Sequence, residues 1–317
     1  MNSDQASMMQ PVSSQLSPQQ IARLQGLQLR ARAVVESVLA GSHRSTRRGF
    51  SVEFAEHRDY APGDDVRYLD WKLLARRDRY YVRQFEDETR FKLICLLDVS
   101  RSMTYRSENA ALSKLDYAAV LAASLLWLVQ KQRDECGLIC FDQGIQLWSP
   151  ANLQGGWLQQ LLAQLQSTMQ RVTSDATAIS TTDEPDLNCK LLHESLERLP
   201  ARSLVVLLTD GFGEVDQLAR VMRHARSRRQ DLRLVQVLDP AELQFPFQEP
   251  TRFHGLESGK SVTLSGASIR DVYLQEFRKF LRELEHACRQ EETQYCRIET
   301  SEDFFTAIRR ITRFTER

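Results

Sequence analysis

The feature that most constrains the fold is a series of short apolar runs separated by segments with helical periodicity. The runs lie at 91–97, 203–209 and 232–238. Each is almost continuously apolar, as is typical of a strand buried on both faces of a parallel sheet. Apolar residues recur with helical spacing in the segments between and around them, at 114–133, 189–199 and 215–229. Buried strands alternating with helices predict an α/β fold with a doubly wound, mostly parallel sheet flanked by helices.

The remainder of this part of the chain extends the same pattern. Two short strand-like runs flank Gln143-Gly144 and predict a hairpin over 136–148. We also expect a helix at 157–169, a polar loop at 171–185 and a second hairpin after residue 238. Further along, the pattern predicts a long helix, a strand and a last helix, at 269–291, 295–299 and 304–314.

The first 90 residues differ in character from the rest. Residues 1–17 are rich in Ser, Gln and Met and are typical of a disordered tail. Ser17-Pro18 signals the start of one helix that stops before Gly41. Residues 41–90 hold many charges and aromatics, with extended stretches at 50–54 and 80–85 and a short helix at 71–75. The sequence therefore predicts a tail, an N-terminal helix with a small β-rich module at 18–90, and an α/β domain at 91–317.

Composition restricts the class of protein. Lys and Arg number 42, as do Asp and Glu, so the 317-residue chain has no basic excess and no nucleic-acid partner is expected. No signal peptide is visible, and the longest apolar stretch, 118–129, is shorter than the ~20 residues of a transmembrane helix. The six cysteines lie mostly in apolar runs and predict buried, reduced thiols. We therefore expect no transmembrane segment and a cytoplasmic location.

Hard oxygen donors follow two of the buried runs. Asp98, Ser100 and Ser102 come after the first run, and Asp210 comes after the second. Because the carboxyl ends of parallel strands meet at one edge of a sheet, we expect these side chains to lie close together. A carboxylate with two hydroxyls suits Mg²⁺ or Mn²⁺, and such a shell leaves room for an acidic ligand from outside. Alternatively, Asp98 caps a turn and Ser102 caps the following helix.

Motifs of the common enzyme classes are missing from the sequence. Gly259-Lys260-Ser261 ends like a phosphate-binding loop, but the preceding glycine, Gly255, is one residue too close. Neither a G-x-S-x-G elbow nor an H-E-x-x-H zinc motif occurs, and the six histidines lack metal-ligand spacing. The sequence predicts a protein that is not an enzyme.

Two sets of residues resemble known families. Asp98-x-Ser100-x-Ser102 with Asp210-Gly211 resembles the metal-ion-dependent adhesion site (MIDAS) of von Willebrand factor A domains. Upstream, several residues resemble the signature of the bacterial DUF58 family: Glu53-Phe54, Arg58-x-Tyr60-x-x-Gly63-Asp64-x-x-Arg67-x-x-Asp70-Trp71 and Phe85-Glu86. The resemblance implies a von Willebrand A-like fold, serines that bind the ion directly, and a protein partner whose acidic side chain completes the shell. It also implies a MoxR-type AAA+ ATPase as partner.

One position departs from the MIDAS pattern. Pro185 stands where the third loop of such a site normally has a threonine, and Asp186 is a possible substitute. The leading hypothesis is a non-enzymatic interaction adaptor that works with the ATPase in assembly or maturation of protein complexes. The alternatives are a metal-free scaffold that docks through the N-terminal module, and a Mg²⁺-dependent phosphoester hydrolase, for which no general base is found.

Overall fold

The computed structural model describes residues 16–42, 57–59, 81–83, 91–174, 189–256 and 261–313. The chain divides into two compact units, one formed by Ser45–Arg90 and the other by the rest of the chain. Within the smaller unit, strands β1 (His57–Asp59) and β2 (Tyr81–Arg83) pair antiparallel. Strand β2 lies inside the extended stretch predicted at 80–85. The extended stretch predicted at 50–54 and the helix predicted at 71–75 lie outside the described residues.

A six-stranded sheet forms the centre of the larger unit, in the order β10-β7-β6-β3-β4-β5. Its strands are β3 (Lys92–Asp98), β4 (Glu135–Phe141), β5 (Ile145–Asn152), β6 (Leu204–Thr209), β7 (Asp231–Leu238) and β10 (Gln294–Glu299). All neighbouring strands run parallel except β4 and β5, which form the predicted antiparallel hairpin. The α/β fold with a mostly parallel sheet is therefore confirmed.

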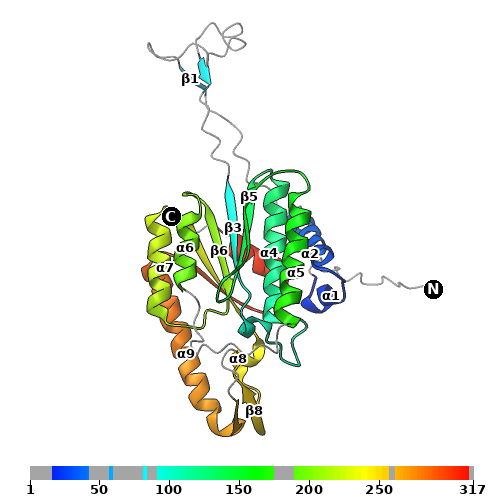
Figure 1. Ribbon diagram of the computed structural model, residues 1–317, viewed down its shortest axis with the longest axis vertical. Coiled ribbons are helices and arrows are strands. Elements are labelled where there is room, and N and C mark those ends of the chain that lie inside the picture. Colours follow the sequence, from blue (N-terminus) through cyan, green and yellow to red (C-terminus); the bar gives the residue numbers. More distant parts are fainter. Residues whose placement is uncertain are drawn as a thin grey trace, which may run out of the picture. The chain divides into compact units, whose positions relative to one another are not determined.

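Helices cover both faces of this sheet (Figure 1). One apolar core contains α1 (Pro18–Ala22), α2 (Leu27–Ser42), α4 (Lys114–Lys131), α5 (Trp157–Ser174) and α10 (Phe304–Thr312). The core of the opposite face contains α6 (Cys189–Arg198), α7 (Val215–Ser227) and the second half of α9 (Gly266–Gln290). Two cores on opposite faces are the arrangement expected of a sheet whose central strands are apolar on both sides.

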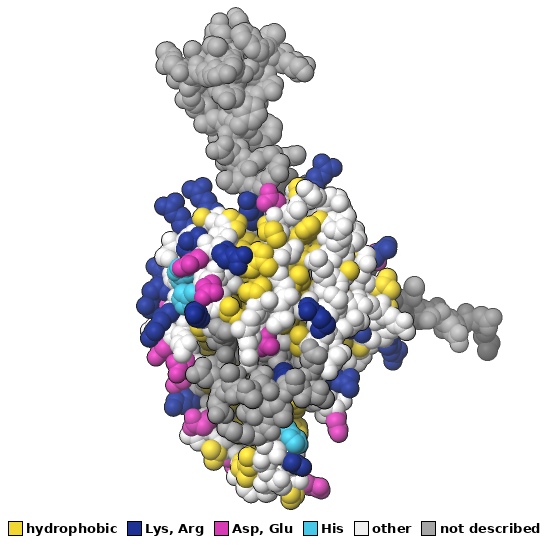
Figure 2. Space-filling view, viewed as in Figure 1, with side chains coloured by type: hydrophobic (Ala, Val, Ile, Leu, Met, Phe, Trp, Pro, Cys, Tyr) yellow, Lys and Arg dark blue, Asp and Glu magenta, His cyan; other side chains and the backbone are white. Residues whose placement is uncertain are grey.

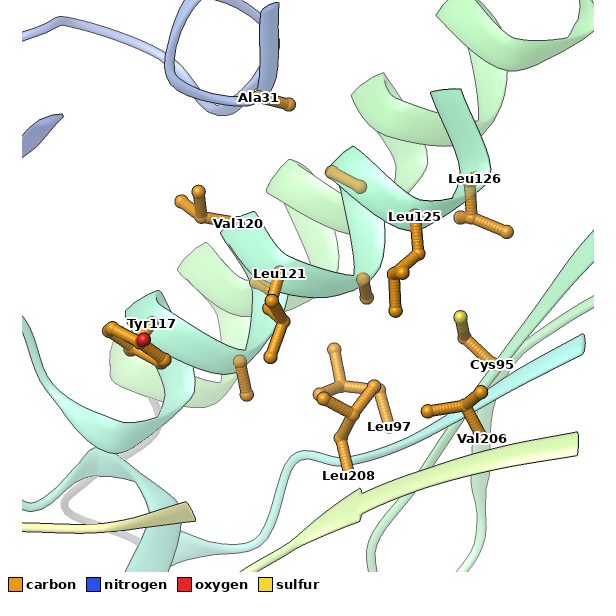
Figure 3. Close-up of a cluster of buried hydrophobic side chains, with 14 of the residues drawn as sticks. Ala31, Cys95, Leu97, Tyr117, Val120, Leu121, Leu125, Leu126, Val206 and Leu208 are labelled. Carbon is orange, nitrogen blue, oxygen red and sulfur yellow. The ribbon is translucent and has the colours of Figure 1, made fainter. Parts of the chain in front are cut away.

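Helix α4 is the central helix of the first core. It is apolar on nearly all sides, as expected of a helix with neighbours all round. Figure 3 shows Leu121 and Leu125 directed toward Leu97 and Leu208 of the sheet, while Ala31 of α2 lies on the opposite side of α4. This packing fixes the amino end of α4 near the carboxyl ends of β3 and β6.

The N-terminal segment differs from the single helix predicted to start at Ser17-Pro18. The expected start is confirmed, since Ser17 caps α1 in a capping box with Gln20. The helix is, however, interrupted between Ala22 and Leu27, so that two helices form instead of one. The break occurs at Gly26, whose φ of +84° suits glycine far better than other residues. From the sequence, this helical segment is predicted to form one module with the rest of residues 18–90. In the structure α2 belongs to the larger unit, where its apolar face packs against α4 and α5.

Two further boundaries bear on the sequence predictions. Helix α5 continues to Ser174, so the polar loop predicted from residue 171 is wrong for its first four positions; residues 175–188 lie outside the described residues. All six cysteines are buried and free of disulfides, as expected. Among the helices that the structure describes, none combines the length and the apolar character needed to cross a membrane.

An insertion lies between β7 and β10. It comprises α8 (Pro240–Gln244), the antiparallel hairpin β8 (Pro250–His254) and β9 (Ser261–Ser265), and then α9. The second predicted hairpin is therefore confirmed. In Figure 1 this hairpin and the first turns of α9 lie beyond the edge of the sheet at which β3 and β6 end.

Candidate functional site

Strands β3 and β6 bring the two predicted loops together. They are neighbours in the sheet and run parallel, with Leu97 opposite Leu208. Asp98 ends β3, and Asp210 directly follows β6 at the same edge. Both carboxylates are buried, each at 3% exposure. The prediction that the loops after β3 and β6 lie close together is therefore confirmed.

Asp98 is held by uncharged donors. Its Oδ1 accepts the backbone N–H of Ser100 at 2.9 Å, and its Oδ2 accepts the hydroxyl of Thr209 at 2.6 Å. The Thr209 oxygen in turn accepts the N–H of Gly211 at 3.0 Å. Thr209 therefore ties the loop after β6 to the carboxylate at the end of β3.

The hydroxyls of Ser100 and Ser102 lie side by side, with their Oγ atoms 3.1 Å apart. Ser102 lies within the short 3₁₀ helix η2 (Arg101–Thr104), and Ser100 precedes that helix without a side-chain capping bond. The alternative in which Ser102 caps a helix is therefore wrong. Asp98 does close a turn through the Ser100 N–H, so that part of the alternative is correct and coexists with the converging hydroxyls.

The charge of Asp98 is disfavoured in this surrounding. Burial, and then the nearby charge of Asp210, raise the pKa of the Asp98 carboxyl to about 7, although the donors Thr209 and Ser100 act in the opposite direction. Two buried carboxylates that repel each other become more stable when a proton or a cation joins them.

Asp210 has a cationic neighbour inside the protein. The Lys114 ammonium lies 3.0 Å from Asp210 Oδ2 and 2.6 Å from Glu242 Oε1 of α8, and its side chain is only 1% exposed. Burial alone would lower the pKa of Lys114, but the two carboxylates outweigh burial and raise it. Burial raises the pKa of the Glu242 carboxyl, even with Lys114 beside it. Lys114 thus links the end of β6 to the insertion.

Comparison with known proteins gives the family. The family model described as "Protein of unknown function DUF58" matches residues 56–282. The chain belongs to the DUF58 family. Uncharacterized proteins of Mycobacterium bovis and Mycobacterium tuberculosis are each 27% identical to this DUF58 chain over 243 residues, covering 76% of it and 72% of the relative.

Solved structures similar to the DUF58 chain share little sequence with it. BatB from Bacteroides thetaiotaomicron has a TM-score of 0.40 at 16% identity, over 66% of this chain and 90% of BatB. An aerotolerance-related membrane protein from Bacteroides fragilis has a TM-score of 0.39 at 16% identity, over 70% and 96%. The VWA domain of SpRpn10 has a TM-score of 0.36 at 11% identity, over 69% and 93%. These likenesses concern the fold alone.

Three residues around Asp98 and Asp210 do not follow from the sequence as members of the candidate site: Lys114, Thr209 and Glu242. A local signal existed for Thr209, which directly precedes Asp210. Lys114 follows the capping residue Ser113 at the start of an otherwise apolar helix, which marks it as unusual without indicating its partners. Glu242 belongs to the capping box of α8 with Asp239, a pattern that indicates a helix start and nothing more.

The donor set fits a hard divalent cation. Asp98, Ser100 and Ser102 offer the carboxylate and hydroxyl oxygens that Mg²⁺ and Mn²⁺ prefer, and a cation would offset the repulsion between Asp98 and Asp210. Among the described residues, no three His, Cys, Asp or Glu side chains are grouped to hold a metal, so a site here depends on the serine hydroxyls. Asp186 and Pro185 lie outside the described residues.

Proposed function

We propose that this DUF58 protein is a non-enzymatic interaction adaptor. It binds Mg²⁺ or Mn²⁺ through Asp98, Ser100 and Ser102, and an acidic side chain of a partner protein becomes a further ligand of the ion. The observation that carries the proposal is that the hydroxyl oxygens of Ser100 and Ser102 lie 3.1 Å apart beside the carboxylate of Asp98. This carboxylate is buried and accepts hydrogen bonds from uncharged donors of Thr209 and Ser100.

The residues at the ends of β3 and β6 would hold the ion in different ways. Asp98 contributes the anionic ligand, and Thr209 fixes its orientation through the 2.6 Å hydrogen bond. Ser100 and Ser102 contribute neutral hydroxyl oxygens. Asp210 contributes negative charge to the same edge, while its Oδ2 stays with Lys114. The bound ion would supply Lewis-acid attraction for a carboxylate.

Lys114 supports the choice of an acidic partner. Because its ammonium offsets the charge of Asp210, a divalent ion beside Asp98 would be only partly neutralised by the protein. Such an ion attracts a carboxylate from outside more strongly than one surrounded by several acidic ligands. The site is thereby suited to recognise Asp or Glu on a protein surface.

The partner we propose is a MoxR-type AAA+ ATPase, as the resemblance to DUF58 proteins implies. The chain itself has no phosphate-binding loop motif, so ATP hydrolysis would come from the partner. The DUF58 protein would then act with the ATPase in the assembly or maturation of protein complexes.

Binding to the purified MoxR-type ATPase of the same organism tests the proposal. We expect chelation of the divalent ion and Asp98→Asn each to raise the dissociation constant at least about tenfold, which corresponds to about 1.4 kcal/mol. Asp271→Asn, an exposed carboxylate on α9, serves as the matched control and should change nothing. Equal binding with and without chelator, or equal binding by Asp98→Asn, would contradict the ion-bridged adaptor.

Lys114 also favours a second candidate, the metal-free scaffold. Its ion pairs with Asp210 and Glu242 offset negative charge at the end of β6 without any metal. In that case docking would use the N-terminal module, and binding would be insensitive to chelator but weakened by Arg58→Glu. The same binding experiment therefore separates the two candidates.

A further inference from the structure

The hairpin β8–β9 and the start of α9 expose an unusual amount of apolar surface. Among the described residues, five large hydrophobic side chains are strongly exposed, and four of them lie here: Leu256, Val262, Leu264 and Val272. Figure 2 shows hydrophobic side chains gathered at the lower end of the molecule, where Figure 1 places this hairpin. Exposed apolar patches on a projecting element are typical of interaction surfaces.

The hairpin is fixed firmly to the unit that carries it. Phe253 of β8 packs against Phe245 and Phe247, with ring centroids 5.7 and 5.3 Å away. A side chain at Gly266, the first residue of α9, would overlap the carbonyl of Phe247, so the start of α9 is in close contact with the segment that precedes β8. The Arg270 guanidinium donates to the Phe245 carbonyl at 3.3 Å. A strand held in this way is preorganised for pairing.

Strand β9 is an unprotected edge. Among the described strands it pairs with β8 alone, and all five of its residues are exposed. Natural proteins protect edge strands with charges or proline. Strand β8 has such protection in Pro250, Arg252 and His254, whereas β9, Ser261–Ser265, has none. The unpaired backbone groups of β9 are therefore available to another strand.

The apolar face of the hairpin indicates how that strand would be covered. Val262 pairs with Phe253 and Leu264 with Thr251, so Val262 and Leu264 share a face with Phe253. That face is packed beneath β8 but open beneath β9, where Val262 is 52% and Leu264 40% exposed. A strand added beside β9 would bring its own side chains against this open part of the face.

The pattern and charge of β9 suit a second copy of the same chain. Ser-Val-Thr-Leu-Ser is symmetric in polarity about Thr263, so antiparallel pairing on a two-fold axis places Val262 opposite the partner's Leu264 and Ser261 opposite the partner's Ser265. Residues near such an axis meet their own copies, and like charges there would repel. Residues 261–269 carry no charge, in a chain of which 26% is charged. A different partner would not require this neutrality.

We propose that the protein forms a two-fold dimer through antiparallel pairing of β9 with β9 of a second copy. The two hairpins become one four-stranded sheet, and Val262 and Leu264 of both copies pack together on its apolar face. This surface is separate from Asp98 and its loop, so the dimer forms with or without a divalent ion.

Sedimentation equilibrium of the full chain in chelator tests the proposal. The wild type should have the mass of two chains at high micromolar concentration. Thr263→Lys places like charges on the axis and should raise the dissociation constant at least roughly tenfold, giving single chains. Gln146→Lys, at an exposed position of the edge strand β5, is the matched control and should remain dimeric. Unchanged far-ultraviolet circular dichroism and melting would show that both variants are folded.

A mixing experiment decides the register. Thr263→Lys mixed with Thr263→Glu should restore the mass of two chains, because opposite charges then meet at the axis. A monomeric wild type, a Thr263→Lys variant as dimeric as the wild type, or a mixture that stays monomeric would each overturn the proposal.

Discussion

The ends of β3 and β6 lie side by side, yet they treat buried negative charge in different ways. Asp210, after β6, has the Lys114 ammonium 3.0 Å away, so its charge is balanced within the chain. Asp98, at the end of β3, accepts hydrogen bonds from the uncharged donors Thr209 and Ser100, and burial and the charge of Asp210 raise its pKa to about 7. The first arrangement is complete without a ligand. The second would gain stability from a proton or a cation, and we therefore propose the β3 loop as the place where a ligand binds.

Removal of Lys114 should have the largest effect on stability. Lys114→Met leaves Asp210 and Glu242 buried without their ammonium, and we expect a loss of about 3–5 kcal/mol in the free energy of unfolding. Denaturant titration measures this loss. Lys131→Met, at the exposed end of the same helix, is the matched control and should change stability by less than about 0.5 kcal/mol. A loss equal to that of the control would remove the contrast between the two strand ends.

The stability of the metal-free protein should depend on pH because the ionised form of Asp98 is disfavoured. The pKa of this carboxyl is about 7 in the folded state, above its ordinary value of 3.8, so the folded protein holds the proton more tightly than the unfolded chain. Its contribution to stability is therefore fully present below about pH 4 and is lost as the pH rises through about 7. We expect a fall on the order of a few kcal/mol over this window.

Denaturant titrations in chelator at a series of pH values measure this fall. Asp98→Asn cannot ionise at this position, so its stability should fall less steeply with rising pH. In the wild type, Mg²⁺ in place of the chelator should also make the fall less steep. The same slope in Asp98→Asn as in the wild type would show that Asp98 carries no unbalanced charge.

Thr209→Val should have an intermediate effect. It removes the hydroxyl that donates to Asp98 and leaves the Gly211 N–H without its acceptor, so we expect a loss of about 1–3 kcal/mol. Thr312→Val, at an exposed position near the end of α10, provides the control and should cost much less. If the two variants were equally stable, Thr209 would not tie the two loops together.

The serine variants should separate binding from stability. Ser100→Ala and Ser102→Ala remove hydroxyls that contact each other, so we expect each to cost less than about 1 kcal/mol of stability. Their affinity for Mn²⁺ should nevertheless fall about tenfold, if a hydroxyl ligand contributes about 1.4 kcal/mol to binding. Ser301→Ala, an exposed serine, should leave both quantities unchanged. Wild-type Mn²⁺ affinity in both site variants would exclude the hydroxyls as ligands.

The sheet and the meeting of its loops could be predicted from sequence because both follow from local pattern. The apolar runs define the buried strands, and parallel strands must end at a common edge. Lys114 could not be assigned in this way, since its partners Asp210 and Glu242 lie 96 and 128 residues further along the chain. The break at Gly26 does not follow from the sequence pattern, because apolar residues continue across it and glycine is tolerated inside helices. Local pattern thus predicts the elements, whereas long-range ion pairs require the structure.

Calorimetric titration of Mg²⁺ and Mn²⁺ into the metal-free protein tests the central claim most directly. We expect saturable binding of one ion per chain in the wild type and in Asp271→Asn, and its loss in Asp98→Asn. Saturable binding that survives in Asp98→Asn would place the ion elsewhere, and the absence of binding in the wild type would contradict a metal site at the end of β3.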